Sequence, residues 1–187
     1  MTSQTEPADL DALRTRFPDA VHATGTPLGE PTALVDRAAY RDAVRFLRDE
    51  RGYNMLRDVT AVDYLTVEPR FHVVAHLAAL PASMLAGNPV PSPDDPLREL
   101  RLKVPVPAGD AVVDSLTSLF PTANFHERET WDLFGIEFAG HPDLRRILMP
   151  DEYEGFPLRK DHPLVYEEVA FSFNQEEIYA KKPFARK

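Results

Sequence analysis

Apolar positions near the start of the chain recur at the spacing of amphipathic helices. Leu10, Leu13 and Phe17 share one helical face and are followed directly by a proline, which predicts a short helix that ends there. A clearer helix is expected over residues 37–51, with Asp36 as its cap and a glycine just past its last turn. The apolar stripe of this second helix consists of Tyr40, Ala43, Val44 and Leu47.

The middle of the chain changes to the alternating pattern of β-strands. Residues 32–35 and 55–66 are rich in branched and aromatic side chains, and every second residue is apolar in 71–79 and 100–106. Because the alternate positions are largely polar, we predict a mostly antiparallel sheet with helices packed on one face. Pro105 has no N–H to donate, so it is expected at a strand end or at an edge of the sheet.

After the last of these strands the helical spacing returns. One predicted helix ends before a proline, and its apolar face consists of Val112, Leu116, Leu119 and Phe120. A second is expected over residues 125–134, with Asn124 and Glu127 arranged as a capping box and Gly135 at its C-terminal end. Beyond His141 the periodicity is lost and prolines recur.

The fold class that follows is α+β, with an extended Pro-rich tail at the C-terminal end. We divide the chain into an N-terminal extension with a short helix at 1–31, an α+β domain at 32–140, and a tail at 141–187. Residues 81–97 form a Pro-rich loop within the domain. Seven aromatic residues in the tail favour docking on a partner over a tail folded back on its own domain, because disordered segments are usually poor in aromatics.

Composition narrows the classes of function. The formal net charge is −9, which argues against a nucleic-acid partner because phosphate backbones require a basic face. The chain has no cysteine, so it offers no disulfide, no thiolate nucleophile and no thiolate ligand for an iron–sulfur cluster. No secretory signal is recognised at the N-terminus, and the most apolar window, residues 73–85, is too short to span a membrane. A soluble, cytoplasmic chain is expected, with any membrane association made through a partner.

Three carboxylates, Glu127, Glu129 and Asp132, lie on the helix predicted over residues 125–134, and paired carboxylates can serve acid–base chemistry. Their spacing argues against this use, because Glu127 and Glu129 point to different faces and Arg128 can pair with Asp132 one turn on. No zinc-type histidine spacing, serine nucleophile motif or phosphate-binding glycine loop is present. A stand-alone hydrolase that uses Glu127 or Glu129 remains the alternative from a different class.

Two arginine pairs point instead to a docking surface. Arg145 and Arg146 are flanked by leucines and an isoleucine, and cations beside apolar anchors are typical of protein interfaces. Arg159 and Lys160, beside Asp161, repeat the arrangement. A solvated charged face is the alternative for both pairs. A third hypothesis for the whole chain is a regulatory binding module that uses the Pro-rich loop as a peptide ligand.

The same residues carry a resemblance to a known family. The run ERETWDLFG, the histidine and arginines of HPDLRRILM, the later GFPLRKDHPL and the upstream LRDVTAVDYL resemble the signature of the C subunit of NADH-quinone oxidoreductase, the thirty-kilodalton-type subunit of respiratory complex I. The resemblance spans most of residues 37–165. Related modules also occur in membrane-bound hydrogenases, which leaves the electron donor open.

The resemblance implies a subunit of the hydrophilic arm that holds no redox centre itself. FMN and iron–sulfur clusters would lie in partner subunits, and the partners would be the large hydrogenase-like D subunit, the B subunit and other members of the arm. This chain would be peripheral, on the cytoplasmic side of the cell membrane, and would associate with the membrane only as part of the complex. The residues then expected at the partner interface are Glu127, Arg128, Glu129, Asp132, Phe134, His141, Asp143, Arg145, Arg146, Leu148, Phe156, Leu158, Arg159, Lys160 and Asp161.

Overall fold

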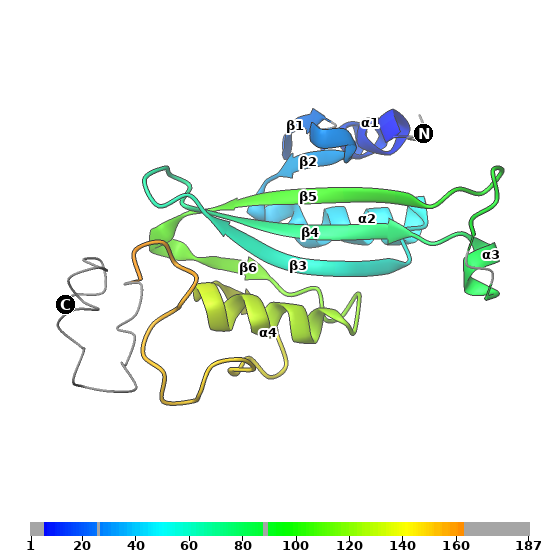
Figure 1. The fold of residues 1–187 in the computed structure, drawn as a ribbon. Helices are drawn as coiled ribbons and strands as arrows, with labels where there is room; N and C mark the ends of the chain where they lie inside the picture. Colours follow the sequence, from blue (N-terminus) through cyan, green and yellow to red (C-terminus); the bar gives the residue numbers. More distant parts are fainter. Residues whose placement is uncertain (1–5, 26, 88–89, 163–187) are drawn as a thin grey trace, which may run out of the picture.

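The structure is a computed structural model and describes residues 6–25, 27–87 and 90–162 (Figure 1). The helices are α1 (Glu6–Arg16), α2 (Tyr40–Arg51), α3 (Ala82–Leu85) and α4 (Ala123–Phe134), and short 3-10 turns span Pro27–Gly29, Arg37–Ala39 and Ala108–Asp110. The strands are β1 (Val21–Gly25), β2 (Thr32–Val35), β3 (Met55–Asp63), β4 (Phe71–Ala79), β5 (Arg98–Val106), β6 (Val112–Asp114) and β7 (Glu137–Ala139).

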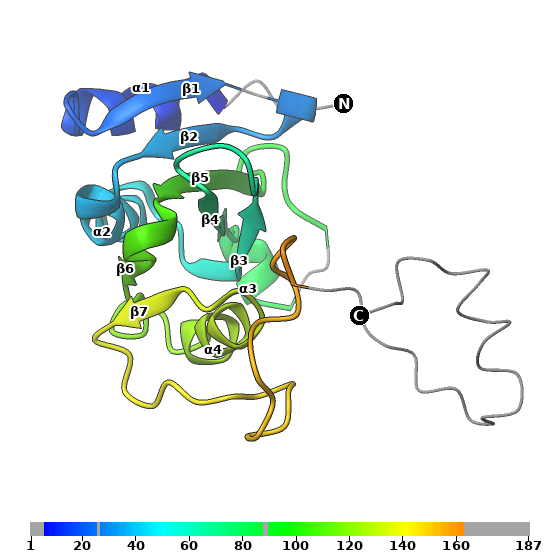
Figure 2. The ribbon, with the colours of Figure 1, turned by 90° about the vertical axis from the view of Figure 1, so that its left-hand side faces the viewer.

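Five strands form the main sheet in the order β1–β2–β5–β4–β3. Neighbours run antiparallel except β2 and β5, which are parallel. β5 therefore lies in the middle of the sheet although it is the last of these five strands in the sequence. α2 covers one face of the sheet, behind β4 and β5 in Figure 1 and beside them in Figure 2. This architecture confirms the predicted α+β class with a mostly antiparallel sheet.

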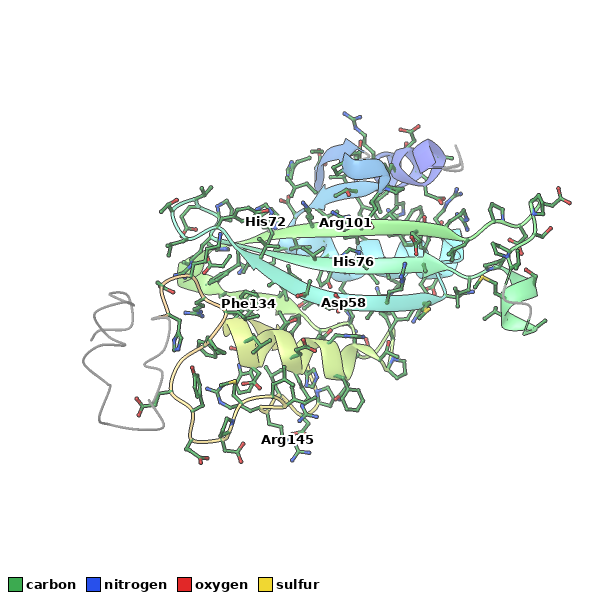
Figure 3. All side chains as sticks on the ribbon, viewed as in Figure 1. Asp58, His72, His76, Arg101, Phe134 and Arg145 are labelled. Carbon is green, nitrogen blue, oxygen red and sulfur yellow. The ribbon has the colours of Figure 1, made fainter. Side chains whose placement is uncertain are left out.

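The alternation along β5 separates a core face from a polar face, as predicted. In β4 the opposite face also holds two buried residues, Val74 and Ala78. Leu102 and Val104 of β5 are fully buried, and they belong to one core cluster with Tyr40 and Leu47 of α2. Figure 3 shows His72, His76 and Arg101 on the opposite face of the sheet, turned toward the viewer.

Several local predictions need adjustment at their ends. β3 stops at Asp63, because the chain turns at Leu65, whose φ is 43° and whose amide donates to the Asp63 carboxylate. Asp36 makes no capping hydrogen bond, and its carboxylate pairs with His22 at 2.7 Å instead. Pro105 is the penultimate residue of β5, past the positions that pair with β2, so its missing N–H leaves no gap in that pairing.

The prediction of a helix over residues 112–120 is wrong. Val112–Asp114 form β6, which pairs in parallel with β7, and Leu116–Phe120 form turns. Apolar positions at these spacings fit one helical face, but they also fit a short buried strand followed by a turn. The strand partner, β7, lies more than twenty residues further along, so nothing local in the sequence reveals it.

α4 confirms the predicted helix and its end but not its beginning. The helix starts at Ala123, its N-cap is Thr122, and no side chain caps it. Gly135 adopts the left-handed conformation at the C-terminal end, and its amide donates to Trp131. The capping box with Asn124 is wrong because the Glu127 side chain points into the interior of the chain.

The boundaries predicted at residues 31 and 140 do not separate structural units. β1 pairs with β2, and Leu10 and Leu13 of α1 belong to the core. Asp9 is 3% exposed and forms ion pairs with Arg51 and Arg98. At the other end, residues 141–162 lie against α4 and the β3–β4 turn, so this part of the predicted tail is folded back on its own domain. Residues 163–187 lie outside the described residues.

Candidate partner interface

α4 divides the predicted interface residues into an inner and an outer set. Glu127 and Asp132 have no exposed surface, and Phe134 is 7% exposed. On the outer side Phe125 is 61% exposed, and Glu129 is exposed as well. For the two buried carboxylates the structure corrects the prediction, because side chains enclosed by their own domain serve its fold.

Glu127 ties α4 to the turn that follows β6. The hydroxyl of Ser115 donates to Glu127 Oε2 at 2.7 Å, and the amide of Leu116 donates to Oε1 at 2.6 Å. Burial raises the pKa of Glu127 to about 7, although both hydrogen bonds oppose the rise. Burial and the nearby Glu127 charge also raise the pKa of the Tyr40 phenol. With Glu127 enclosed and Glu129 exposed, the two do not form the carboxylate pair that a hydrolase would need.

Asp132 fastens the segment that follows β7 onto α4. Its Oδ2 accepts hydrogen bonds from the amides of Ile147, Leu148 and Met149 at 3.0, 2.8 and 2.9 Å, and Arg146 pairs with Oδ1 at 2.6 Å. Burial would raise the pKa of Asp132, but these four hydrogen bonds together lower it below its ordinary value. The carboxylate is therefore held as an anion at neutral pH.

The predicted pair between Arg128 and Asp132 is absent, since the arginine serves a different role. Arg128 donates to the carbonyls of Arg145 and Arg146, at 3.1 Å each. Arg145 and Arg146, which were predicted together as part of the docking surface, differ in environment. The Arg146 side chain is 13% exposed and donates to the carbonyls of Tyr153 and Gly155, whereas the Arg145 side chain is 70% exposed and pairs with Asp143 at 2.9 Å.

The C-terminal end of α4 provides a second attachment. The amide of Leu158 donates to the carbonyl of Leu133 at 3.1 Å, and Arg159 Nε donates to that of Phe134 at 2.6 Å. These bonds satisfy carbonyls that a helix end leaves unpaired, and they place a cation where the helix dipole is negative. The Phe156 ring lies so close to Gly135 that an added Cβ there would overlap it.

A third attachment joins the segment to the β3–β4 turn. Arg70 forms ion pairs with Asp63 at 2.8 Å and with Asp161 at 2.6 Å. The amide of Lys160 donates to Asp63 at 2.8 Å. The hydrogen bonds from Arg70 hold the pKa of Asp63 far below its ordinary value, with the amides of Lys160 and Leu65 adding to the effect. Sequence analysis missed Arg70, although Asp63 lies in the upstream LRDVTAVDYL motif.

We call residues 143–161, which these three attachments hold, the strap. Its outer surface carries Leu148 at 59% exposure, Leu158 at 50% and Ile147 at 37%. Figure 3 shows Arg145 beyond α4 at the outer margin of the described chain. Of the predicted interface residues, Glu129, Asp143, Arg145, Leu148, Leu158, Lys160 and Asp161 are exposed, Arg128, His141, Arg146, Phe156 and Arg159 are half-buried, and Glu127, Asp132 and Phe134 are buried.

Within the described residues, no group of three or more histidine, aspartate or glutamate side chains is placed to hold a metal ion. Over the same ranges, no helix combines the length and the apolar character needed to cross a bilayer. Part of the predicted surface is a strap with exposed apolar and charged side chains, held on a sheet-and-helix domain.

Comparison with known proteins names the family. The family model described as respiratory-chain NADH dehydrogenase, 30 Kd subunit, matches residues 33–168. A protein from Roseiflexus sp. (strain RS-1), named as the C subunit of NADH-quinone oxidoreductase, is 47% identical over 179 residues, 95% of each chain. A protein of the same name from Herpetosiphon aurantiacus is 44% identical over 164 residues, 87% of this chain and 88% of that one. The chain belongs to the family of the 30 kDa subunit of respiratory-chain NADH dehydrogenase.

Two solved structures share the fold. A trypsin-resistant fragment of Nqo5 is 31% identical with a TM-score of 0.60, and the match covers 74% of this chain and 98% of that one. A chain in the structure of a membrane-bound sulfane sulfur reductase, an archaeal respiratory membrane complex, matches with a TM-score of 0.62 over 95% of this chain and 91% of that one. At 19% identity, this second likeness concerns the fold alone.

Proposed function

We propose that this chain is a non-catalytic structural subunit of the peripheral arm of a proton-translocating NADH-quinone oxidoreductase. In that complex electrons would pass from NADH through FMN and iron–sulfur clusters, all held by partner subunits, to quinone. The identity of 47% over 95% of the Roseiflexus chain supports the assignment. The lack of cysteine in this chain is consistent with iron–sulfur clusters that are ligated elsewhere.

The strap is the feature of the structure that supports a structural role. Several polar side chains in the family-like motifs, among them Asp63, Asp132 and Arg159, fasten residues 143–161 to the domain, and apolar side chains remain exposed on the outer surface of this segment. Exposed apolar groups next to charges are what an assembly partner covers. The proposed partners are the large hydrogenase-like D subunit, the B subunit and other members of the hydrophilic arm. The chain would then be peripheral, on the cytoplasmic side of the membrane, through this assembly.

Charge reversal at Arg145 tests this role, because the structure separates Arg145 from its buried neighbour Arg146. Reversal of Arg146 would break the ion pair with Asp132 and destabilise the domain itself. Arg145→Glu reverses an exposed charge and breaks only the solvent-exposed pair with Asp143, so it should change the unfolding midpoint little and lower the amount of large subunit that co-purifies with a tagged chain. Arg14→Glu on α1, on the far side of the domain in Figure 1, is the matched control.

Mass spectrometry of the proteins that co-purify from membranes in mild detergent provides the readout. If the tagged natural chain brings down no component of an NADH-quinone oxidoreductase, the proposed function is wrong. If the complex assembles at normal yield with Arg145→Glu, the function stands and the interface lies elsewhere.

A further inference from the structure

One turn of the strap points its backbone amides toward a single buried carboxylate oxygen. Three successive amides, of Ile147, Leu148 and Met149, donate to Asp132 Oδ2 at distances of 2.8 to 3.0 Å. Successive N–H groups that converge on one anion form the kind of concave backbone nest that binds anions in proteins. Because the amides face the domain, the side chains of Ile147 and Leu148 are left 37% and 59% exposed.

The same turn is held from both sides by arginines. Arg128 donates to the carbonyls of Arg145 and Arg146, which lie immediately before the three amides. Arg146 completes the coordination of Asp132, and its guanidinium lies over the rings of Trp131 and Tyr153 at 5.8 and 5.9 Å. Charge-assisted hydrogen bonds that are shielded from solvent are stronger than neutral ones, so the turn is fixed before any partner arrives.

We propose that Arg145, Ile147 and Leu148 form a preformed knuckle that inserts into an apolar pocket, rimmed by a carboxylate, on a partner protein. This inference rests on the proposed function and identifies the chemistry of its contact. The partner carboxylate follows from Arg145, whose side chain is 70% exposed and is paired only at the surface, with Asp143. A second copy of this chain fits the knuckle poorly, because two chains of net charge −9 repel one another.

Asp132 is then a positioning residue: it touches no partner, but it sets the direction in which the knuckle points. A rigid apolar anchor loses little conformational entropy on binding, and residues of this kind carry most of the energy of many interfaces. Residues 145–149 would thus bind as a shaped unit, and binding should weaken either when the anchor is changed or when its support is loosened.

Leu148→Asp changes the anchor, and Leu85→Asp on α3, where the leucine is 65% exposed, is the matched control. The experiment measures binding of the full chain to the remaining components of the purified complex. Leu148→Asp replaces the apolar anchor with a charge, so it should weaken binding by roughly 10- to 100-fold, with an unchanged unfolding midpoint. Leu85→Asp should bind like the natural chain. Equal binding of Leu148→Asp and Leu85→Asp would overturn the knuckle.

Asp132→Asn tests the positioning role, because it removes the carboxylate charge and can place an amide NH₂ group against the Arg146 guanidinium. Hydrogen exchange should become at least about tenfold faster at the amides of residues 147–149, while the amides of β4 keep their protection, and binding should weaken in parallel. Unchanged exchange at the three amides would contradict the nest. If this variant unfolds as a whole, Leu148→Asp decides alone.

A photo-reactive residue in place of Leu148 tests the chemistry of the partner. It should crosslink to another subunit, in a segment with apolar residues and an aspartate or glutamate, whereas a crosslink between two copies of this chain would overturn the proposal. The outcomes also separate the two proposals. A chain that joins no oxidoreductase complex refutes the proposed function, and a chain that joins it regardless of residue 148 refutes only the knuckle.

Discussion

Glu127→Gln should remove a pH dependence of stability that the natural chain carries. The carboxyl group has an ordinary pKa of 4.5, and burial raises the pKa in the folded chain to about 7. Between these values the unfolded chain has an ionised Glu127, while the folded chain keeps it protonated. The folded state then binds more protons, so the contribution of Glu127 to stability falls as the pH rises from 4.5 to about 7 and is constant above pH 7.

The size of the effect follows from the same two values. Their difference of about 2.5 corresponds to about 3 kcal/mol, at roughly 1.4 kcal/mol for each pKa unit. Glutamine mimics the protonated form, because its side-chain oxygen can accept a hydrogen bond from the Leu116 amide and its NH₂ can donate one to the Ser115 oxygen. The Ser115 hydroxyl can then donate to the Thr117 hydroxyl, which lies 2.8 Å away. Near pH 4.5 the variant and the natural chain should therefore have similar stability. Above pH 7 the variant should be more stable, by up to about 3 kcal/mol.

Urea unfolding from pH 4.5 to 8.5 measures the free energy of unfolding of the natural chain and of Glu127→Gln. The titration of all other groups cancels in the difference between the two values. Glu129→Gln removes a charge from the exposed side of the same helix and should change the free energy of unfolding by less than about 0.5 kcal/mol at every pH. A Glu127→Gln difference that does not vary with pH, or that grows as the pH falls, would refute the reasoning.

Two further predictions concern the attachments of the strap. Gly135→Ala adds a Cβ that overlaps the Phe156 ring at a φ of +70°, and thermal unfolding should show that the chain loses at least about 2 kcal/mol of stability. The control Gly140→Ala, at a φ of +83° with open space around it, should lose only the roughly 1 kcal/mol that backbone strain costs. Equal losses of stability in the two variants would argue against the packing of Phe156 on Gly135. Asp63→Asn weakens the bonds to Arg70 and should lower the free energy of unfolding by about 1–3 kcal/mol at pH 7. Because the pKa of Asp63 is lowered in the folded chain, this difference should shrink as the pH falls below the ordinary value of 3.8, and a constant difference would contradict the ion pair.

Periodicity in the sequence was sufficient for the elements that pack against the core. The stripe of Tyr40, Val44 and Leu47 on α2 and the alternation along β5 are repeated over several turns or residue pairs, and burial of one side satisfies both patterns. The short segment at Val112–Asp114 gave no such repetition, and its strand pairing depends on β7.

The surface was harder to predict because local rules competed with contacts between distant segments. Glu127 occupies the place of a capping-box residue, yet Leu116 and Ser115 bind its carboxylate from eleven and twelve positions away. Asp132 lies one helical turn from Arg128, but Arg146, delivered by the strap, takes the pairing. Sequence analysis singled out Asp132, Arg146 and Arg159 but missed Arg70. Only the folded chain separates the side chains that hold the strap from those exposed on it.

The position of β5 has a consequence for how the chain acquires its structure. β5 (Arg98–Val106) joins β2 to β4, so the first two strands have no route into the sheet until β5 itself has been synthesised. Contacts between segments this far apart close slowly, because a long loop must lose its freedom before the pairing is rewarded. β1 and β2 can pair with each other as they leave the ribosome, but the edge of β2 that later pairs with β5 stays open until then, and an open strand edge favours pairing with other chains.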